Sequence, residues 1–133
     1  MSEAALSTSV QREFAGRRRR FELRIGEIGE LERHCDAGIG AILVRLATMN
    51  FKASDIRETV RLGLMGGGET EAEATHLTLY YVDKRPLGDS LQLASDIVNA
   101  CVNGVVDEGK GPGETEKSAD PATSPPSTEP VAP

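Results

Sequence analysis

The apolar residues that precede the C-terminal segment of the chain recur at helical spacing without a break. They follow one another in alternating steps of four and three residues: Leu87, Leu91, Ala94, Val98, Cys101 and Val105. Side chains at this spacing lie on one face of an α-helix. Pro86 precedes the run, and proline suits the first turn of a helix because no backbone N–H is needed there. The pattern predicts an amphipathic helix over residues 87–104 that buries its apolar face.

Four shorter segments upstream have the same periodicity and predict further helices, at about residues 26–36, 39–48, 55–65 and 71–83. The third is expected to begin after Ser54, which is a favourable N-cap residue. The fourth is expected to begin at Thr70, because Thr70 and Glu73 have the spacing of a capping box.

The segment before these helices alternates between apolar and charged residues, which is the period of a half-buried strand. Phe21, Leu23 and Ile25 are its apolar positions, and a turn is expected at Ala15-Gly16. We therefore predict an N-terminal β-hairpin within residues 10–25, with strands at about 10–14 and 19–25. The fold class is mainly α: a small bundle of about five short helices preceded by a β-hairpin. The domain is expected to span residues 10–105 and to follow a flexible segment, residues 1–9.

Residues 106–133 differ from this domain in composition. They hold six of the seven prolines and no aromatic residue. They carry 2 basic and 6 acidic side chains, whereas residues 1–104 carry 13 basic and 15 acidic ones. Such a segment buries too little apolar surface to offset the entropy lost on ordering. An acidic, proline-rich, disordered tail is predicted.

The sequence has no apolar run of about 20 residues, the length needed to cross a bilayer. Its N-terminus lacks the basic start and apolar core of a secretory signal. We expect a cytoplasmic bacterial protein whose Cys35 and Cys101 stay reduced and pack in the core.

The glycine triplet Gly66–Gly68 invites comparison with a phosphate-binding loop. Such a loop follows a strand and ends in lysine and then serine or threonine. Here the glycines follow a predicted helix, and Glu69 stands where the lysine would be. A helix C-terminal cap followed by a linker is the better interpretation.

No catalytic, metal-binding or cofactor-binding constellation is found. His34, Cys35 and Asp36 are consecutive, so on a helix their side chains diverge by about 100° per residue. His76 has no partner at metal-ligand spacing. Two groups of acidic residues are interpreted as solvated faces and helix-start charges: Glu27, Glu30 and Glu32, and Glu69, Glu71 and Glu73. We expect a protein without enzymatic activity.

Arg17, Arg18, Arg19 and Arg20 form the sharpest basic feature, at the expected hairpin tip. Four arginines could contact nucleic-acid phosphates. The cluster lacks interleaved aromatic residues, and the chain has a net charge of −6, which argues against nucleic acid. A solvated turn or a contact with an acidic partner surface is the other interpretation.

Two segments carry more apolar residues than one buried stripe requires. Apolar residues on a second helix face often serve partner binding or self-association. The candidate partner-binding residues are Leu62, Leu64, Met65, Tyr80 and Tyr81.

Residues of about 10–105 resemble a known family, the tail assembly chaperones of bacterial gene transfer agents and related siphophage-like prophages. The resemblance is carried by the segments IGEIGELE, DIRETVRLGLMGGG and YVDKRPL; none is a catalytic motif. It implies a chaperone that binds the helical tape-measure protein and helps to bring tail-tube subunits to it. Two alternatives stay open: a structural tail component retained in the particle, and a small nucleic-acid-associated regulator that uses Arg17–Arg20.

Overall fold

The computed structural model describes residues 6–106. Residues 6–105 form one folded unit, and the predictions for residues 1–5 and 107–133 lie outside the described residues. The segment 6–9, expected to be flexible, already contains strand. Strand β1 (Leu6–Ser7) pairs with β4 (Val105–Val106), and β2 begins at Ser9. Within residues 6–106, no helix is long and apolar enough to cross a membrane.

The predicted N-terminal hairpin is confirmed. Strands β2 (Ser9–Phe14) and β3 (Arg17–Glu22) pair antiparallel, with Val10 opposite Phe21. Ala15 and Gly16 connect them with φ angles of 54° and 87°. A two-residue turn with both φ angles positive matches the twist of the flanking strands.

The second strand ends earlier than expected. Helix α1 (Ile25–Cys35) begins at Ile25, which is 85% exposed instead of facing the core. The Glu27 carboxylate accepts the backbone N–H of Arg24 at 2.9 Å. This bond satisfies one of the free N–H groups of the first turn, and so it favours helix over strand here.

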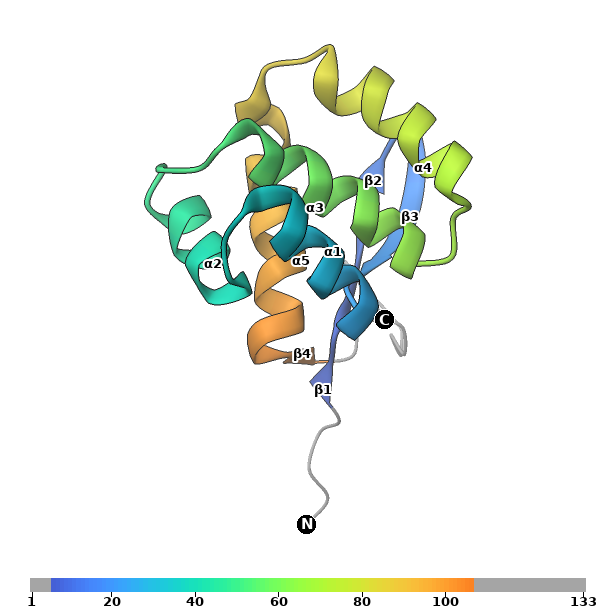
Figure 1. Ribbon diagram of the computed structural model, residues 1–133. Coiled ribbons are helices and arrows are strands. Elements are labelled where there is room, and N and C mark those ends of the chain that lie inside the picture. Colours follow the sequence, from blue (N-terminus) through green and yellow to red (C-terminus); the bar gives the residue numbers. More distant parts are fainter. Residues whose placement is uncertain (1–5, 107–133) are drawn as a thin grey trace, which may run out of the picture. The chain divides into compact units, whose positions relative to one another are not determined.

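Four more α-helices complete the bundle: α2 (Ile39–Ala47), α3 (Ala53–Gly66), α4 (Glu71–Thr78) and α5 (Leu91–Asn103). Helix α3 lies at the centre of the bundle and contacts the other four helices and β3 (Figure 1). The mainly helical fold class is therefore as predicted.

Two of the predicted helices change their geometry at one end. The segment 71–83 is α4 followed by a π-helical turn, η1 (Leu79–Asp83), and the segment 87–104 opens with a 3₁₀ turn, η2 (Leu87–Ser90). Helix α3 begins at Ala53, two residues before the predicted start at 55, and its cap is Lys52 instead of Ser54, because the Asp55 carboxylate accepts the N–H of Lys52 at 2.8 Å. The Thr70 cap is confirmed, since its hydroxyl accepts the N–H of Glu73 at 3.1 Å.

The glycine triplet ends α3, as predicted. The N–H of Glu69 bonds to the C=O of Leu64, and that of Gly68 to the C=O of Met65, at 2.9 and 3.0 Å. Together with the φ of +120° at Gly68, these bonds form a Schellman motif.

Two of the same glycines also allow a close backbone contact. A Cβ atom added to Gly66 would lie 1.8 Å from the carbonyl oxygen of Glu22, and one added to Gly67 would lie 2.0 Å from that of Arg20. The end of α3 thus rests directly on the backbone of β3 and fixes the position of the hairpin.

A buried polar network joins the first three helices. Asp55, fully buried in α3, accepts hydrogen bonds from Arg45 of α2 at 2.6 and 2.9 Å. Lys52 donates to the backbone oxygen of Cys35 in α1 at 3.1 Å. Burial raises the pKa of Asp55, but the hydrogen bonds from Arg45 and the Lys52 amide outweigh it and hold the pKa below its ordinary value.

Both cysteines are free, as expected. Cys35 is buried and Cys101 half-buried. Burial, strengthened by the hydrogen bond and charge of Asp55, raises the pKa of Cys35 to about 12. Burial raises the pKa of Cys101 to about 11.

Candidate protein-interaction surfaces

Two of the five candidate contact residues belong to the core, which leaves them unavailable for contact with a partner. Of the two, Leu62 was expected to point away from the buried stripe and lie exposed, and this exposure is wrong. Leu62 is 2% exposed and Leu64 is fully buried. Helix α3 is packed on several sides, by α1, α4, α5 and β3. Its second apolar face therefore meets other parts of the same chain. A helix that is apolar on more than one face is typical of a central position, and this signal was available in the sequence.

The other three candidates do not form one patch. Met65 is half-buried beside α1 and α4. Tyr81 is half-buried, with its ring 5.8 Å from that of Phe14 and 5.0 Å from the Arg85 guanidinium. Tyr80 is 46% exposed on the π-helical turn.

Tyr80 lies in an exposed row of side chains along α4 and η1. Its ring centre is 4.8 Å from that of His76, and the Lys84 ammonium lies 4.3 Å above the ring. His76 is at the surface, as predicted.

Substitutions at Leu62 and Tyr80 should change the free energy of unfolding by different amounts, since Leu62 lies in the core and Tyr80 at the surface. Leu62→Ala is expected to lower the free energy of unfolding by about 2–5 kcal/mol, because it leaves a cavity. Tyr80→Ala should change it by about 1 kcal/mol or less. Urea denaturation followed by circular dichroism measures both. Equal losses would contradict the assignment of Leu62 to the core and Tyr80 to the surface.

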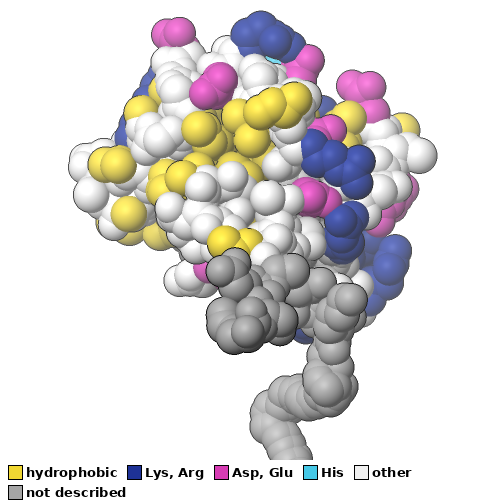
Figure 2. Space-filling model, turned by 90° about the horizontal axis from the view of Figure 1, so that it is seen from below, with side chains coloured by type: hydrophobic (Ala, Val, Ile, Leu, Met, Phe, Trp, Pro, Cys, Tyr) yellow, Lys and Arg dark blue, Asp and Glu magenta, His cyan; other side chains and the backbone are white. Residues whose placement is uncertain are grey.

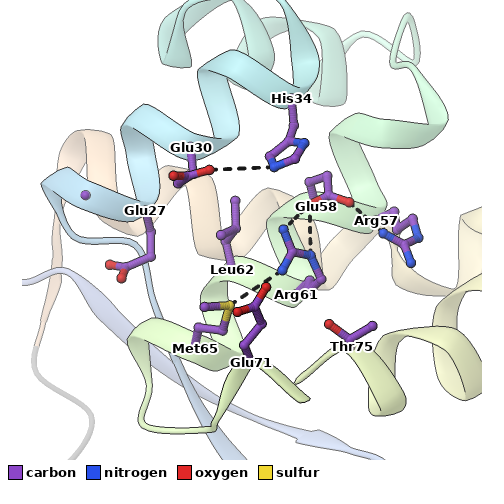
Figure 3. Close-up of a pocket in the computed structure, with 11 residues that line it drawn as sticks. Glu27, Glu30, His34, Arg57, Glu58, Arg61, Leu62, Met65, Glu71 and Thr75 are labelled. Carbon is purple, nitrogen blue, oxygen red and sulfur yellow. Dashed lines mark hydrogen bonds and ion pairs between the residues drawn. The ribbon is translucent and has the colours of Figure 1, made fainter. Parts of the chain in front are cut away.

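A groove of about 500 Å³ lies between α1, α3 and α4 (Figure 3). Leu62 and Met65 of α3 contribute apolar atoms to it. The remaining lining residues are mostly charged or polar: Gly26, Glu27, Glu30, His34, Arg57, Glu58, Arg61, Glu71 and Thr75. The sequence analysis did not predict this groove, because its residues come from three separate segments.

Glu58 is held within the groove by two guanidinium groups. Arg61 donates to it at 2.7 and 2.9 Å, and Arg57 donates at 2.6 Å. Burial raises the pKa of Glu58, but the hydrogen bonds and charges of the two arginines outweigh it and lower the pKa. Glu58 therefore stays ionised and is poorly suited to accept a proton in catalysis.

The groove also brings His34 near acidic residues. His34 Nε2 lies 3.7 Å from a carboxylate oxygen of Glu30, and both side chains are almost half exposed. Across residues 6–106, no group of three or more His, Cys, Asp or Glu side chains is arranged to hold a metal ion. The arrangement is that of an open, charged surface groove.

The acidic residues near helix ends have more specific roles than solvation. Glu27 caps the start of α1, and Glu32 accepts the N–H of Ile39 at the start of α2, at 2.8 Å. Glu69 forms ion pairs with Arg17 and Arg19, at 3.6 and 3.2 Å.

The arginine cluster divides between structural and exposed side chains. Arg19 is largely buried; it donates to the backbone oxygen of Phe14 at 2.8 Å and pairs with Glu69. Arg20 pairs with Glu22. Arg17, with a side chain 65% exposed, and Arg18 remain at the surface. Internal pairing reduces the charge available to phosphates and weighs against the nucleic-acid interpretation.

Exposed apolar residues mark a further surface that the sequence analysis missed. Val44 of α2 is 59% exposed, and Met49, just beyond α2, is 67% exposed. Figure 2 shows apolar side chains gathered toward the side on which α2 lies, with most basic side chains on the opposite side. The segment IGAILVRLA is apolar on nearly every side of its helix, which exceeds what one buried face requires.

Comparison with family models identifies the group to which the chain is related. The model described as phage tail tube protein, GTA-gp10, matches residues 7–104. The chain belongs to this family. The match covers almost the whole folded unit, whereas neither the curated proteins nor the solved structures gave a significant match. Membership in a gene transfer agent and phage tail family confirms the coarser part of the resemblance drawn from the sequence, and the description names a tail component.

Proposed function

We propose that this protein is a non-enzymatic structural component of a gene-transfer-agent or phage-like tail. The observation that carries the proposal is the family match over residues 7–104. Because the match includes both the hairpin and all five helices, it concerns the folded unit as a whole.

The surface of the folded unit supports a role in protein contacts. Val44 and Met49 expose apolar area at α2, and Tyr80 exposes apolar area separately on η1. Exposed apolar patches are typical of interfaces with other proteins. Glu58, the buried carboxylate of the groove, is held in ion pairs with Arg57 and Arg61. Such a surface is better suited to recognising a partner than to transferring protons or groups.

Mass spectrometry of purified particles tests the proposal. A structural component should be recovered from density-purified particles in a constant ratio to other tail proteins. The matched control is the lysate of the same culture, in which the chain must also be detected. Detection in the lysate together with loss from the purified particles would contradict a structural role.

The tape-measure chaperone is the second candidate, and the groove between α1, α3 and α4 is the observation that favours it. A groove of about 500 Å³ with apolar and charged walls could hold a segment of a helical client. Co-expression with the tape-measure protein, followed by pull-down, tests this function. A chaperone should raise the yield of client in the supernatant and be absent from finished particles. A client that stays in the supernatant equally well without this chain would count against it.

A further inference from the structure

The groove has an excess of negative charge. Its lining holds four glutamates but two arginines, and both arginines already bond to Glu58. Glu27 and Glu71 form no ion pair with any residue between 6 and 106. They come from different helices, Glu27 from α1 and Glu71 from the first turn of α4 (Figure 3). Cationic side chains would therefore be attracted to two sides of this groove.

The same chain presents such side chains at the tip of its hairpin. Arg17 and Arg18 are exposed and follow directly after the turn at Ala15-Gly16. Successive residues of a strand point to opposite faces. Arg17 lies on the side where it pairs with Glu69, and Arg18 projects to the other side of the hairpin. Guanidinium groups bind carboxylates through paired hydrogen bonds.

The groove does not include the hairpin of the same chain. Its lining residues come from α1, α3 and α4, and none belongs to β2 or β3. The hairpin rests with its backbone on Gly66 and Gly67 at the end of α3. Its tip is held there by the ion pairs of Arg17 and Arg19 with Glu69. A hairpin tip that enters a groove must therefore come from another molecule.

We propose that the groove between α1, α3 and α4 receives the β2–β3 hairpin tip of a second copy of this chain. Arg18 of the incoming tip pairs with a glutamate on the groove wall, and the aliphatic part of its side chain lies against Met65. The inference rests on the proposed structural role in the tail. Since the two contacting surfaces differ, the contact is head-to-tail, and repetition gives a closed ring or an open helical assembly.

Charge-reversal variants of the full chain, studied by sedimentation velocity, test this contact. Arg18→Glu reverses the charge at the hairpin tip; Arg18 donates a hydrogen bond to the Gln11 side chain. Glu71→Lys reverses one charge on the wall of the groove. Glu73→Lys is the matched control, because Glu73 lies in the same helical turn but does not line the groove. Circular dichroism should be the same for all of these proteins.

The unaltered chain should associate at low salt and dissociate as salt is raised, because screening weakens exposed ion pairs. Arg18→Glu alone and Glu71→Lys alone should each weaken association by about tenfold or more, and Glu73→Lys should not. A mixture of the first two should associate again, since each reversed charge then meets its opposite.

Three results would overturn the contact: a chain that stays monomeric at low salt, reversals without effect, or a mixture that fails to associate. If particles contain the chain but these results are obtained, the contact alone is wrong. Absence from particles would instead remove the structural role itself.

Discussion

Replacing Gly66 with alanine is expected to lower the free energy of unfolding by about 3 kcal/mol or more. The added Cβ would lie 1.8 Å from the carbonyl oxygen of Glu22, and a backbone atom cannot move aside as a flexible side chain can. Forcing atoms into a closely packed site typically costs about 1–3 kcal/mol, and sometimes more. A loss of this size should lower the Tm of a domain of about 100 residues by more than about 10 °C. Thermal denaturation followed by circular dichroism measures the effect.

The chain offers two matched controls for this substitution. Gly26 in α1 and Gly40 in α2 are helical glycines whose added Cβ would meet nothing within 4 Å. Alanine at either position should stabilise the protein by about 0.5–1 kcal/mol, since alanine favours helix over the unfolded chain. A Gly66→Ala protein as stable as these controls would show that the end of α3 does not rest on β3 as described.

Replacing Asp55 with asparagine is expected to lower the free energy of unfolding by about 3–5 kcal/mol. The change removes the charge from a fully buried carboxylate and leaves the guanidinium of Arg45 without its partner. Removing one member of an ion pair with a buried carboxylate can have a cost of this order, because the amide that replaces it loses the charge-assisted hydrogen bonds from Arg45 and the Lys52 N–H. Arg57 and Asp83 provide the comparison, since both of these paired side chains are partly exposed. Asp83→Asn should cost about 1 kcal/mol or less.

The same network predicts how stability depends on pH. The pKa of Asp55 is lowered in the folded protein, so the folded state binds its proton more weakly than the unfolded state does. The contribution of this group is therefore complete above the unfolded pKa of about 3.9 and is lost as the pH falls through the lower, folded value. Urea denaturation at pH 7 and at pH 3 should show a larger acid loss for the unaltered protein than for Asp55→Asn. An equal loss would mean that other carboxylates dominate acid unfolding.

Local patterns were sufficient to predict much of this fold. The apolar stripe over 87–104 and the turn at Ala15-Gly16 depend on neighbouring residues, and both predicted the correct element. Errors arose where a contact made at the element's end changed its limits. Asp55 moved the start of α3, and Glu27 turned the end of the expected strand into helix α1.

The candidate contact residues were harder to predict, because exposure depends on what packs against a helix. Leu62 and Leu64 lie on different sides of α3, and both are buried because α1, α4, α5 and β3 pack around this helix. The groove is likewise formed by segments distant in sequence: Glu27 and Glu71 lie on different helices. Spacing within one segment carries no information about such a pairing.

The raised pKa values of the two cysteines make the chain convenient for selective chemical labelling. The pKa is about 12 at Cys35 and about 11 at Cys101, so only a very small fraction of each thiol is ionised at neutral pH. The ionised form, the thiolate, is the one that attacks alkylating reagents. A cysteine introduced at an exposed position such as Arg18 or Tyr80 would react far faster than either native thiol. Fluorescent dyes and cross-linkers can thus be attached at a chosen site without first removing Cys35 from the core.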